Sequence, residues 1–485
     1  MKITNSMTGK KELFIPIKEG EVKMYGCGIT VYDLSHIGHA RQAIVYAMIT
    51  EYFKYKGYKV TYVRNYTDVD DKIIKKANER GITALELSEE QIKETEKDMK
   101  NLHVEDADIK VKASEYINPI IEFIEELIKK GNAYVTEKGD VYFSVKTFPE
   151  YGKLSHRKIS DMRNGVRIEL EKDKKAPVDF ALWKSAKENE IYWKSPWGNG
   201  RPGWHIECSV MILKNLGETI DIHGGGRDLL FPHHENEIAQ SEALTGKPLA
   251  NYWNHCGLVK INGEKMSKSL GNSLTIRKAL QMYNYEVIKY LMLSKHYASD
   301  IDITDESFKI SENHMYYFYK TIKKMDDFIA KEKESNEKTI IKNNITETIE
   351  RNFVDAMDDD FNSSLAIANL HTLFKYANSI MKTSTKNNTK VVANTLSKIL
   401  NDVKKTYKVL GMFEQVPEDF INEMRIKYIE KLNIDVIKVE EKIKTRLEAK
   451  KRKEFEIADK IRNELTAIGI ILEDSNNGTY WDIKI

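Results

Sequence analysis

The sequence contains few cysteines and no long apolar segment, and both absences argue against whole classes of protein. Its three cysteines, Cys27, Cys208 and Cys256, are far apart among 485 residues, which argues against a disulfide framework and indicates a reducing compartment. No segment approaches the roughly 20 apolar residues that cross a membrane, and the first residues lack the apolar stretch of a secretory signal. We therefore expect a cytoplasmic protein.

The chain also lacks an excess of charge of either sign. Its 76 Lys and Arg residues against 74 Asp and Glu residues leave a formal charge of +2. The total charge therefore does not indicate nucleic-acid binding, and any such surface must be a local patch. A hydrophobic fraction of 41% and a charged fraction of 31% are typical of a globular protein, and 485 residues predict about three domains.

The pattern of apolar residues predicts an α/β fold with a Rossmann-like parallel sheet. Residues 22–28 predict a strand that ends in a Gly-rich turn, the apolar positions within 40–48 predict one face of a helix, and residues 59–63 predict the next strand. Strand, helix and strand in this order form the βαβ unit of a parallel sheet. Residues 116–197 interrupt this pattern and are predicted to be an insertion with a hairpin around Gly139.

Beyond about residue 307 the chain reads as almost wholly helical until an apolar run near its end. The predicted parts are a Rossmann-like catalytic domain of residues 1–115 and 198–262, a connective insertion of residues 116–197, a loop and linking helical region at 263–306, a helical bundle at 307–415 and a small C-terminal domain at 416–485. No internal repeat is evident.

Two short motifs carry residues suited to phosphate chemistry. His36-Ile37-Gly38-His39 lies between a predicted strand and a helix N-terminus, where free N–H groups and the helix dipole favour a polyphosphate. The residues Lys265 to Ser269 (KMSKS) follow a predicted strand on a Gly-containing loop, where two ammonium groups could track the charge of a leaving pyrophosphate. Taken singly, the first motif also fits helix-cap and packing residues, and the second also fits a solvated surface loop.

Four residues are candidate metal ligands. His233 and Glu237 are four positions apart, so on a helix they share one face, while Cys27 and Cys208 offer soft thiolate donors. Their spacing is not that of a zinc finger, whose ligands come in close pairs, and the same residues also fit buried packing positions and a helix cap. An HExxH metalloprotease motif is excluded, because Ile238 stands where the second histidine is required.

The two phosphate motifs, in this order and each after a strand, resemble the HIGH and KMSKS signatures of class I aminoacyl-tRNA synthetases. Longer stretches resemble the cysteinyl-tRNA synthetase family: MYGCGITVYDLSHIGHARQ, RNYTDVDDKI, GRPGWHIECSVM, DIHGGGRDLLFPHHENEIAQSEA, NGEKMSKSLGN and, at the C-terminal end, LEAKKRKEFEIADKIRNELTAIGIILEDSNNGTYW. The resemblance covers nearly the whole chain. Two positions depart from the family pattern: Ile29 stands where proline is usual, and Cys256 is not at a ligand position, so we expect it to be a buried packing residue.

The resemblance implies an enzyme that activates L-cysteine with ATP and Mg²⁺ and transfers it to tRNA(Cys). It implies one zinc ion per chain, with the ligands Cys27, Cys208, His233 and Glu237. By the same resemblance, Thr67 and Trp204 line the cysteine pocket, and Asp228 contacts the amino acid or the ribose of ATP.

The ATP phosphates are assigned to the two signature motifs. His36 and His39 are the expected phosphate ligands. Lys265 and Lys268 are expected to stabilise the transition state of adenylation, with Lys268 as the stronger candidate for an ATP contact.

The C-terminal tail carries a local basic patch despite the near-neutral total charge. Its candidate tRNA contacts are Arg446, Lys450, Arg452 and Trp481. Basic side chains suit phosphates, and Trp481 with Tyr480 could stack on unpaired anticodon bases. The same residues also fit a solvated helix face and a small core.

Two other functions compete with this interpretation. An ATP-dependent ligase that joins cysteine to an amino sugar would share the zinc and ATP motifs but lack the tail. A nucleic-acid-binding protein with a structural zinc would need neither signature motif. The long helical region and the two motifs favour the synthetase, and a monomer is expected.

Overall fold

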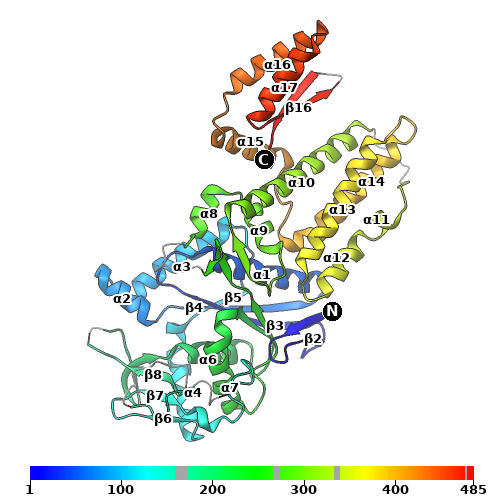
Figure 1. Ribbon diagram of the computed structural model, residues 1–485. Helices are drawn as coiled ribbons and strands as arrows, with labels where there is room; N and C mark the ends of the chain where they lie inside the picture. Colours follow the sequence, from blue (N-terminus) through cyan, green and yellow to red (C-terminus); the bar gives the residue numbers. More distant parts are fainter. Residues whose placement is uncertain (159–172, 189, 266–272, 333–338, 476–477) are drawn as a thin grey trace. The chain divides into compact units, whose positions relative to one another are not determined.

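The computed structural model describes residues 1–158, 173–188, 190–265, 273–332, 339–475 and 478–485. The chain divides into two compact units (Figure 1). The first contains Met1–Thr304, Asn352–Ile367 and Val409–Gly411, and the second contains Asp305–Arg351, Ala368–Lys408 and Met412–Ile485. The five-part division expected from the sequence is finer than this and stays a prediction.

A five-stranded parallel sheet forms the centre of the first unit, as the sequence predicts. Its strands, in spatial order, are β12 (Ala250–Cys256), β11 (Ile220–Gly226), β3 (Glu21–Thr30), β4 (Lys59–Thr67) and β5 (Ile109–Lys112). The chain starts the sheet at β3, adds β4 and β5 on one side, and later adds β11 and β12 on the other. The point between β3 and β11, where the strand order reverses, is where ligands bind in such folds, at the carboxyl ends of the strands.

Helices cover both faces of this sheet (Figure 1). They are α1 (Ile37–Tyr55), α2 (Asp71–Arg80), α3 (Ala84–Asn101), α6 (Trp204–Asn215) and α7 (Glu235–Thr245). Successive side chains of β3 point to opposite faces of the sheet, so every second residue lies on the same face. Tyr25 and Cys27 pack in one buried cluster with Met211 and Ile212 of α6 and Ile238 of α7.

The stretch between β5 and α6 is an antiparallel sheet with one helix, in the region where the sequence predicts an insertion. Its elements are α4 (Ile117–Lys129), β6 (Ala133–Val135), β7 (Val141–Phe143), β8 (Phe180–Ser185), β9 (Trp193–Ser195) and β10 (Gly198–Pro202). The predicted hairpin around Gly139 is confirmed as β6 and β7, with Gly139 at a φ of +90°.

Smaller elements complete the first unit. They are the pair β1 (Lys2–Asn5) and β2 (Lys10–Leu13), the sheet of β13 (Val259–Ile261), β14 (Glu264–Lys265) and β15 (Ile301–Ile303), and the helices α8 (Ile276–Met282) and α9 (Tyr285–Leu293). The short β13–β14 hairpin leads into the KMSKS motif, which apart from Lys265 lies outside the described residues.

The second unit is mainly helical, as predicted. Its helices are α10 (Asp305–Lys331), α11 (Asn344–Glu347), α14 (Thr389–Tyr407), α15 (Pro417–Lys431), α16 (Val436–Lys451) and α17 (Phe455–Ala467), with most of α13 (Ser363–Lys382); α12 (Ile349–Asp358) crosses from this unit to the first. The apolar run near the end forms a hairpin of β16 (Ile470–Ser475) and β17 (Gly478–Ile483). Among the described residues, no helix has both the length and the apolar character needed to cross a bilayer.

Candidate active site

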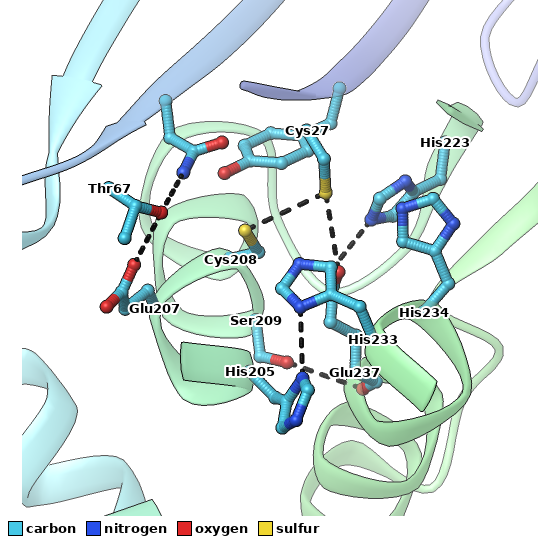
Figure 2. A network of polar contacts seen from close by, with 12 residues as sticks. Cys27, Thr67, His205, Glu207, Cys208, Ser209, His223, His233, His234 and Glu237 are labelled. Atoms are coloured by element: carbon cyan, nitrogen blue, oxygen red, sulfur yellow. Dashed lines mark hydrogen bonds and ion pairs between the residues drawn. The ribbon is translucent and has the colours of Figure 1, made fainter. Parts of the chain in front are cut away.

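The four predicted metal ligands come together at the reversal point of the sheet (Figure 2). Cys27 lies in the second half of β3, Cys208 lies on α6, His233 lies in the helical turn Leu230–His234, and Glu237 lies on the first turn of α7. The Sγ atoms of Cys27 and Cys208 are 3.8 Å apart. Glu237 Oε1 lies 3.4 Å from Cys27 Sγ and 2.9 Å from His233 Nε2.

This donor set fits a zinc ion. One ligand atom from each residue can be chosen so that all four lie within 4.8 Å of one another, and all four residues are buried. Two sulfurs bound tetrahedrally at about 2.3 Å from zinc would be about 3.8 Å apart, which is the separation of the two cysteines. Two thiolates, an imidazole and a carboxylate form a borderline-soft set that suits zinc rather than magnesium or calcium.

A glycine brings Cys27 to this position. At Gly28 a Cβ atom would lie 1.6 Å from the backbone oxygen of Asn65, so only glycine lets β3 approach β4 this closely. The register of the two strands shifts between Gly26 and Ile29, and such an irregularity re-aims the side chains beside it.

The carboxylate of Glu237 and the neighbouring His233 shift each other's pKa values. Burial alone would raise the pKa of Glu237, but the adjacent His223 and His233 rings hold it well below its usual range. Burial alone would lower the pKa of His233, but Glu237 and Cys208 raise it to about 10.

The pKa values of the two thiols are shifted in opposite directions. Burial raises the pKa of the Cys27 thiol well above its usual range, and the neighbouring Cys208 adds to this. Burial opposes ionisation of Cys208 as well, but the hydrogen bond donated by Cys27 and the nearby His233 lower its pKa to about 6. These opposite shifts make Cys208 the more acidic of the two thiols.

Four histidines beside this cluster were not predicted as site residues. His223 Nε2 lies 2.7 Å from Glu237 Oε2, and His205 Nδ1 lies 3.0 Å from His233 Nδ1. His234 Nδ1 lies 2.8 Å from His255 Nε2. The signal was present for His205, His223 and His234, which lie in the matching motifs GRPGWHIECSVM and DIHGGGRDLLFPHHENEIAQSEA; His255 lies in none of the motifs quoted above.

These histidines extend the donor cluster. The ligand atoms of Cys27, His223, His234 and Glu237 form a second group within 4.8 Å of one another. Burial lowers the pKa of His205, His234 and His255, and for His255 the value is about 3. Neutral imidazoles accept at one nitrogen and donate at the other, so such contacts orient the rings around a metal.

The predicted cysteine-pocket residues flank this cluster. Thr67 ends β4, next to β3, and its Oγ1 donates to Glu207 Oε2 at 3.0 Å. Trp204 begins α6, is 38% exposed, and its ring centroid lies 4.3 Å from that of His233. Burial raises the pKa of Glu207 well above its usual range, and the nearby Cys208 and Asp68 add to this.

A cleft of about 330 Å³ adjoins Trp204 and contains the predicted nucleotide residues. Its lining includes His36, His39, Trp204 and Asp228. His36 is the N-cap of α1, and its Nδ1 accepts from the Gly38 amide at 3.2 Å. The structure therefore places the first motif both as a helix cap and as a wall of the cleft.

Comparison with known proteins identifies the family. Residues 13–313 match the model "tRNA synthetases class I (C) catalytic domain", and residues 352–414 match the DALR domain. The "Cysteine--tRNA ligase" of Thermodesulfovibrio yellowstonii is 47% identical over 492 residues, and that of Maridesulfovibrio salexigens is 44% identical over 486 residues; both alignments cover 100% of each chain. The chain belongs to the cysteine--tRNA ligase family of class I tRNA synthetases.

Solved structures agree at the level of the fold. A Mycobacterium tuberculosis methionyl-tRNA synthetase in complex with methionyl-adenylate has a TM-score of 0.61 at 13% identity, over 82% of this chain and 94% of that one. A putative arginyl tRNA synthetase from Campylobacter jejuni has a TM-score of 0.59 at 14% identity, with the same coverage. The predicted α/β fold of a class I synthetase is confirmed.

Two predicted ATP residues of this synthetase lie at or beyond the described part of the chain. Lys265 is described only in its backbone, which pairs with Lys260 in the β13–β14 hairpin. Lys268 lies outside the described residues. The roles of both lysines stay predictions.

The candidate tRNA contacts have unequal surroundings. Arg446 is 1% exposed, and its guanidinium forms two contacts of 2.9 Å with the exposed carboxylate of Asp474. Lys450 contacts the same carboxylate at 2.6 Å. Arg452 is exposed, while Trp481 Nε1 donates to a glutamate on α16 at 2.5 Å. Of the three basic candidates, Arg452 is thus the one with an exposed side chain and no ion pair within the described residues.

Cys256 lies apart from both groups of donors. It ends β12, is 2% exposed and belongs to neither set of candidate metal ligands among the described residues. Its predicted burial is confirmed.

Proposed function

We propose that this enzyme activates L-cysteine with ATP and joins it to tRNA(Cys), with a zinc ion on Cys27, Cys208, His233 and Glu237 selecting the cysteine thiol. The observation that carries the proposal is the convergence of two thiols, an imidazole and a carboxylate next to Trp204, which also lines the cleft that contains His36 and His39. Full-length identity of 47% to a "Cysteine--tRNA ligase" supports it. The same full-length coverage, tail included, disfavours the amino-sugar ligase.

Cysteine has to be distinguished from serine, which differs only by an oxygen in place of the sulfur. Shape alone in an apolar pocket contributes about 1–3 kcal/mol to such discrimination. When bound, a zinc ion lowers the pKa of the substrate thiol and holds the thiolate, whereas a serine hydroxyl is harder and far less acidic. Trp204 and Thr67 would then enclose the rest of the amino acid, beside His233 and Glu207.

Activation is an in-line attack of the cysteine carboxylate oxygen on the α-phosphorus of ATP. The new bond yields cysteinyl-adenylate, and pyrophosphate leaves with the electrons of the broken P–O bond. Positioning and charge stabilisation dominate such reactions. His36 and His39, at the N-terminus of α1, would hold the phosphates, and the two lysines of the KMSKS motif would stabilise the pyrophosphate.

In the second step, a hydroxyl of the terminal tRNA ribose attacks the carbonyl carbon of the adenylate and AMP leaves. The tail is the proposed tRNA contact outside the catalytic centre, with Arg452 and Trp481 as candidates because basic and aromatic side chains suit phosphates and unpaired bases. A monomeric, cytoplasmic enzyme stays a prediction.

The direct test is ATP–pyrophosphate exchange with each amino acid in turn, using the full chain, together with metal analysis. We expect exchange with cysteine and not with serine or alanine, and one zinc ion per chain. A protein without metal that still prefers cysteine to serine would refute the role of zinc. Exchange with another amino acid in preference to cysteine would refute the proposed substrate.

A further inference from the structure

We propose that Glu207 is a positioning residue that fixes the Thr67 hydroxyl as a hydrogen-bond acceptor and so makes the amino-acid pocket specific for the substrate's α-ammonium group. This inference rests on the proposed function, because it takes Thr67 to line the cysteine pocket. Glu207 is fully buried, follows the pocket residue Trp204 by three positions on α6, and precedes the metal-ligand candidate Cys208.

Three hydrogen bonds connect β3, β4 and α6 in a single direction, and Figure 2 shows the last of them, from Thr67 to Glu207. The amide of Gly28 donates to Asn65 Oδ1 at 2.8 Å. Asn65 Nδ2 donates to Thr67 Oγ1 at 3.4 Å, and Thr67 Oγ1 donates to Glu207 Oε2 at 3.0 Å.

The direction of these three hydrogen bonds follows from the first donor, the backbone amide of Gly28. A backbone N–H can only donate, so the Asn65 oxygen must face Gly28 and the Asn65 amino group must face Thr67. The Thr67 oxygen therefore accepts from Asn65, and its single hydrogen goes to Glu207. Glu207 Oε2 accepts whether or not the other carboxyl oxygen carries a proton, so the direction does not depend on the charge of Glu207.

A hydroxyl whose hydrogen is committed can offer a ligand only its remaining lone pair. That lone pair matches an ammonium group, which has three donors and no acceptor. Without an acceptor at position 207, the Thr67 hydroxyl would be free to rotate and to present its hydrogen to the pocket instead. Glu207 thus acts through Thr67.

The environment of Glu207 supports a role beyond joining α6 to β4. Its Oε1 has no hydrogen-bond partner among the described residues, although the side chain is 0% exposed. An unsatisfied buried carboxyl oxygen is costly in a fold. An apolar residue would fill the same space at lower cost, so a buried side chain with an acceptor oxygen beside the pocket points to a role in ligand binding.

The test compares L-cysteine with 3-mercaptopropionate, which keeps the thiol and the carboxylate but lacks the ammonium group. Binding of both ligands is measured by calorimetry on zinc-loaded full-length protein, for the wild type, Glu207→Met and Glu207→Gln. We expect Glu207→Met to weaken L-cysteine binding about 10-fold or more, as loss of a hydrogen bond to a charged group implies, and to change 3-mercaptopropionate binding by less than about 2-fold. Glu207→Gln keeps an acceptor oxygen and should restore most of the loss.

A double-mutant cycle separates positioning from a structural contact. Thr67→Val removes the hydroxyl at nearly constant shape, so adding Glu207→Met to it should cause no further loss of L-cysteine binding. Equal weakening of both ligands, an additive double mutant, or failure of Glu207→Gln to restore binding would overturn the proposal. If the Glu207→Met protein does not fold, Glu207→Leu, which also lacks an acceptor oxygen, takes its place in the same ligand comparison. Wild-type protein that does not prefer L-cysteine to L-serine would instead refute the proposed function.

Discussion

Zinc binding by the four-residue cluster should release about two protons per metal ion near neutral pH. Without metal, Cys27 holds a proton, because burial raises its pKa well above its usual range. His233 also holds one, because Glu237 and Cys208 outweigh its burial and raise its pKa to about 10. Cys208, with a pKa lowered to about 6, and Glu237, with a pKa held well below its usual range, are already ionised at pH 7.5.

The magnitude follows from this count of protons. Metal ligands must be deprotonated, so each displaced proton makes the affinity rise about 10-fold for each pH unit. Two protons predict a rise of about 100-fold, or about 2.7 kcal/mol, for each pH unit. The affinity for zinc therefore increases with pH, in the range between the Cys208 pKa of about 6 and the His233 pKa of about 10.

The assay is calorimetric titration of zinc into metal-free protein in two buffers that differ in ionisation enthalpy. The difference between the two observed enthalpies gives the number of protons released, and repetition at pH 7, 7.5 and 8 gives the slope, about 2 in logarithmic units. Cys256→Ser is the matched control, because Cys256 is also a buried cysteine but belongs to neither donor set. Release of no proton, or an affinity independent of pH, would refute the placement of protons on Cys27 and His233.

Four substitutions test the remaining assignments. Cys208→Ser should lose both the metal and the preference for cysteine over serine, as metal analysis and pyrophosphate exchange would show; an unchanged metal content would remove Cys208 from the ligands. Lys268→Ala should slow single-turnover adenylation by more than it weakens cysteine binding, since a transition-state contact affects turnover first; a normal rate would make it a surface lysine. Arg452→Ala should raise the KM for tRNA and leave pyrophosphate exchange intact, and its effect should shrink at high salt; an unaltered KM would exclude this contact. Arg446→Met should lower the unfolding free energy of the tail by about 1 kcal/mol through loss of the ion pair with Asp474, whose carboxylate is exposed, seen as faster hydrogen exchange in α16 with unchanged metal content; unaltered exchange would contradict its structural role.

The sequence by itself was sufficient for features that depend on local pattern. The strands around residues 22–28 and 59–63, the hairpin at Gly139 and the helical second unit all follow from periodicity and turn residues, which act over a few positions. The shared face of His233 and Glu237 follows from helical spacing in the same way. The family resemblance, carried by contiguous motifs, assigned Cys27 and Cys208 as zinc ligands together with these two residues.

Only the tertiary structure showed which distant residues meet. The placement of β11 beside β3, rather than beside β5, brings His223 to within 2.7 Å of Glu237 and joins the histidines into one cluster. The bond from Thr67 to Glu207 spans 140 positions and depends on the packing of α6 against β4. Burial likewise pairs Arg446 with Asp474, and its role as a tRNA contact stays a prediction. Strand order and burial arise from contacts between segments far apart in the chain, so no spacing within a single segment encodes them.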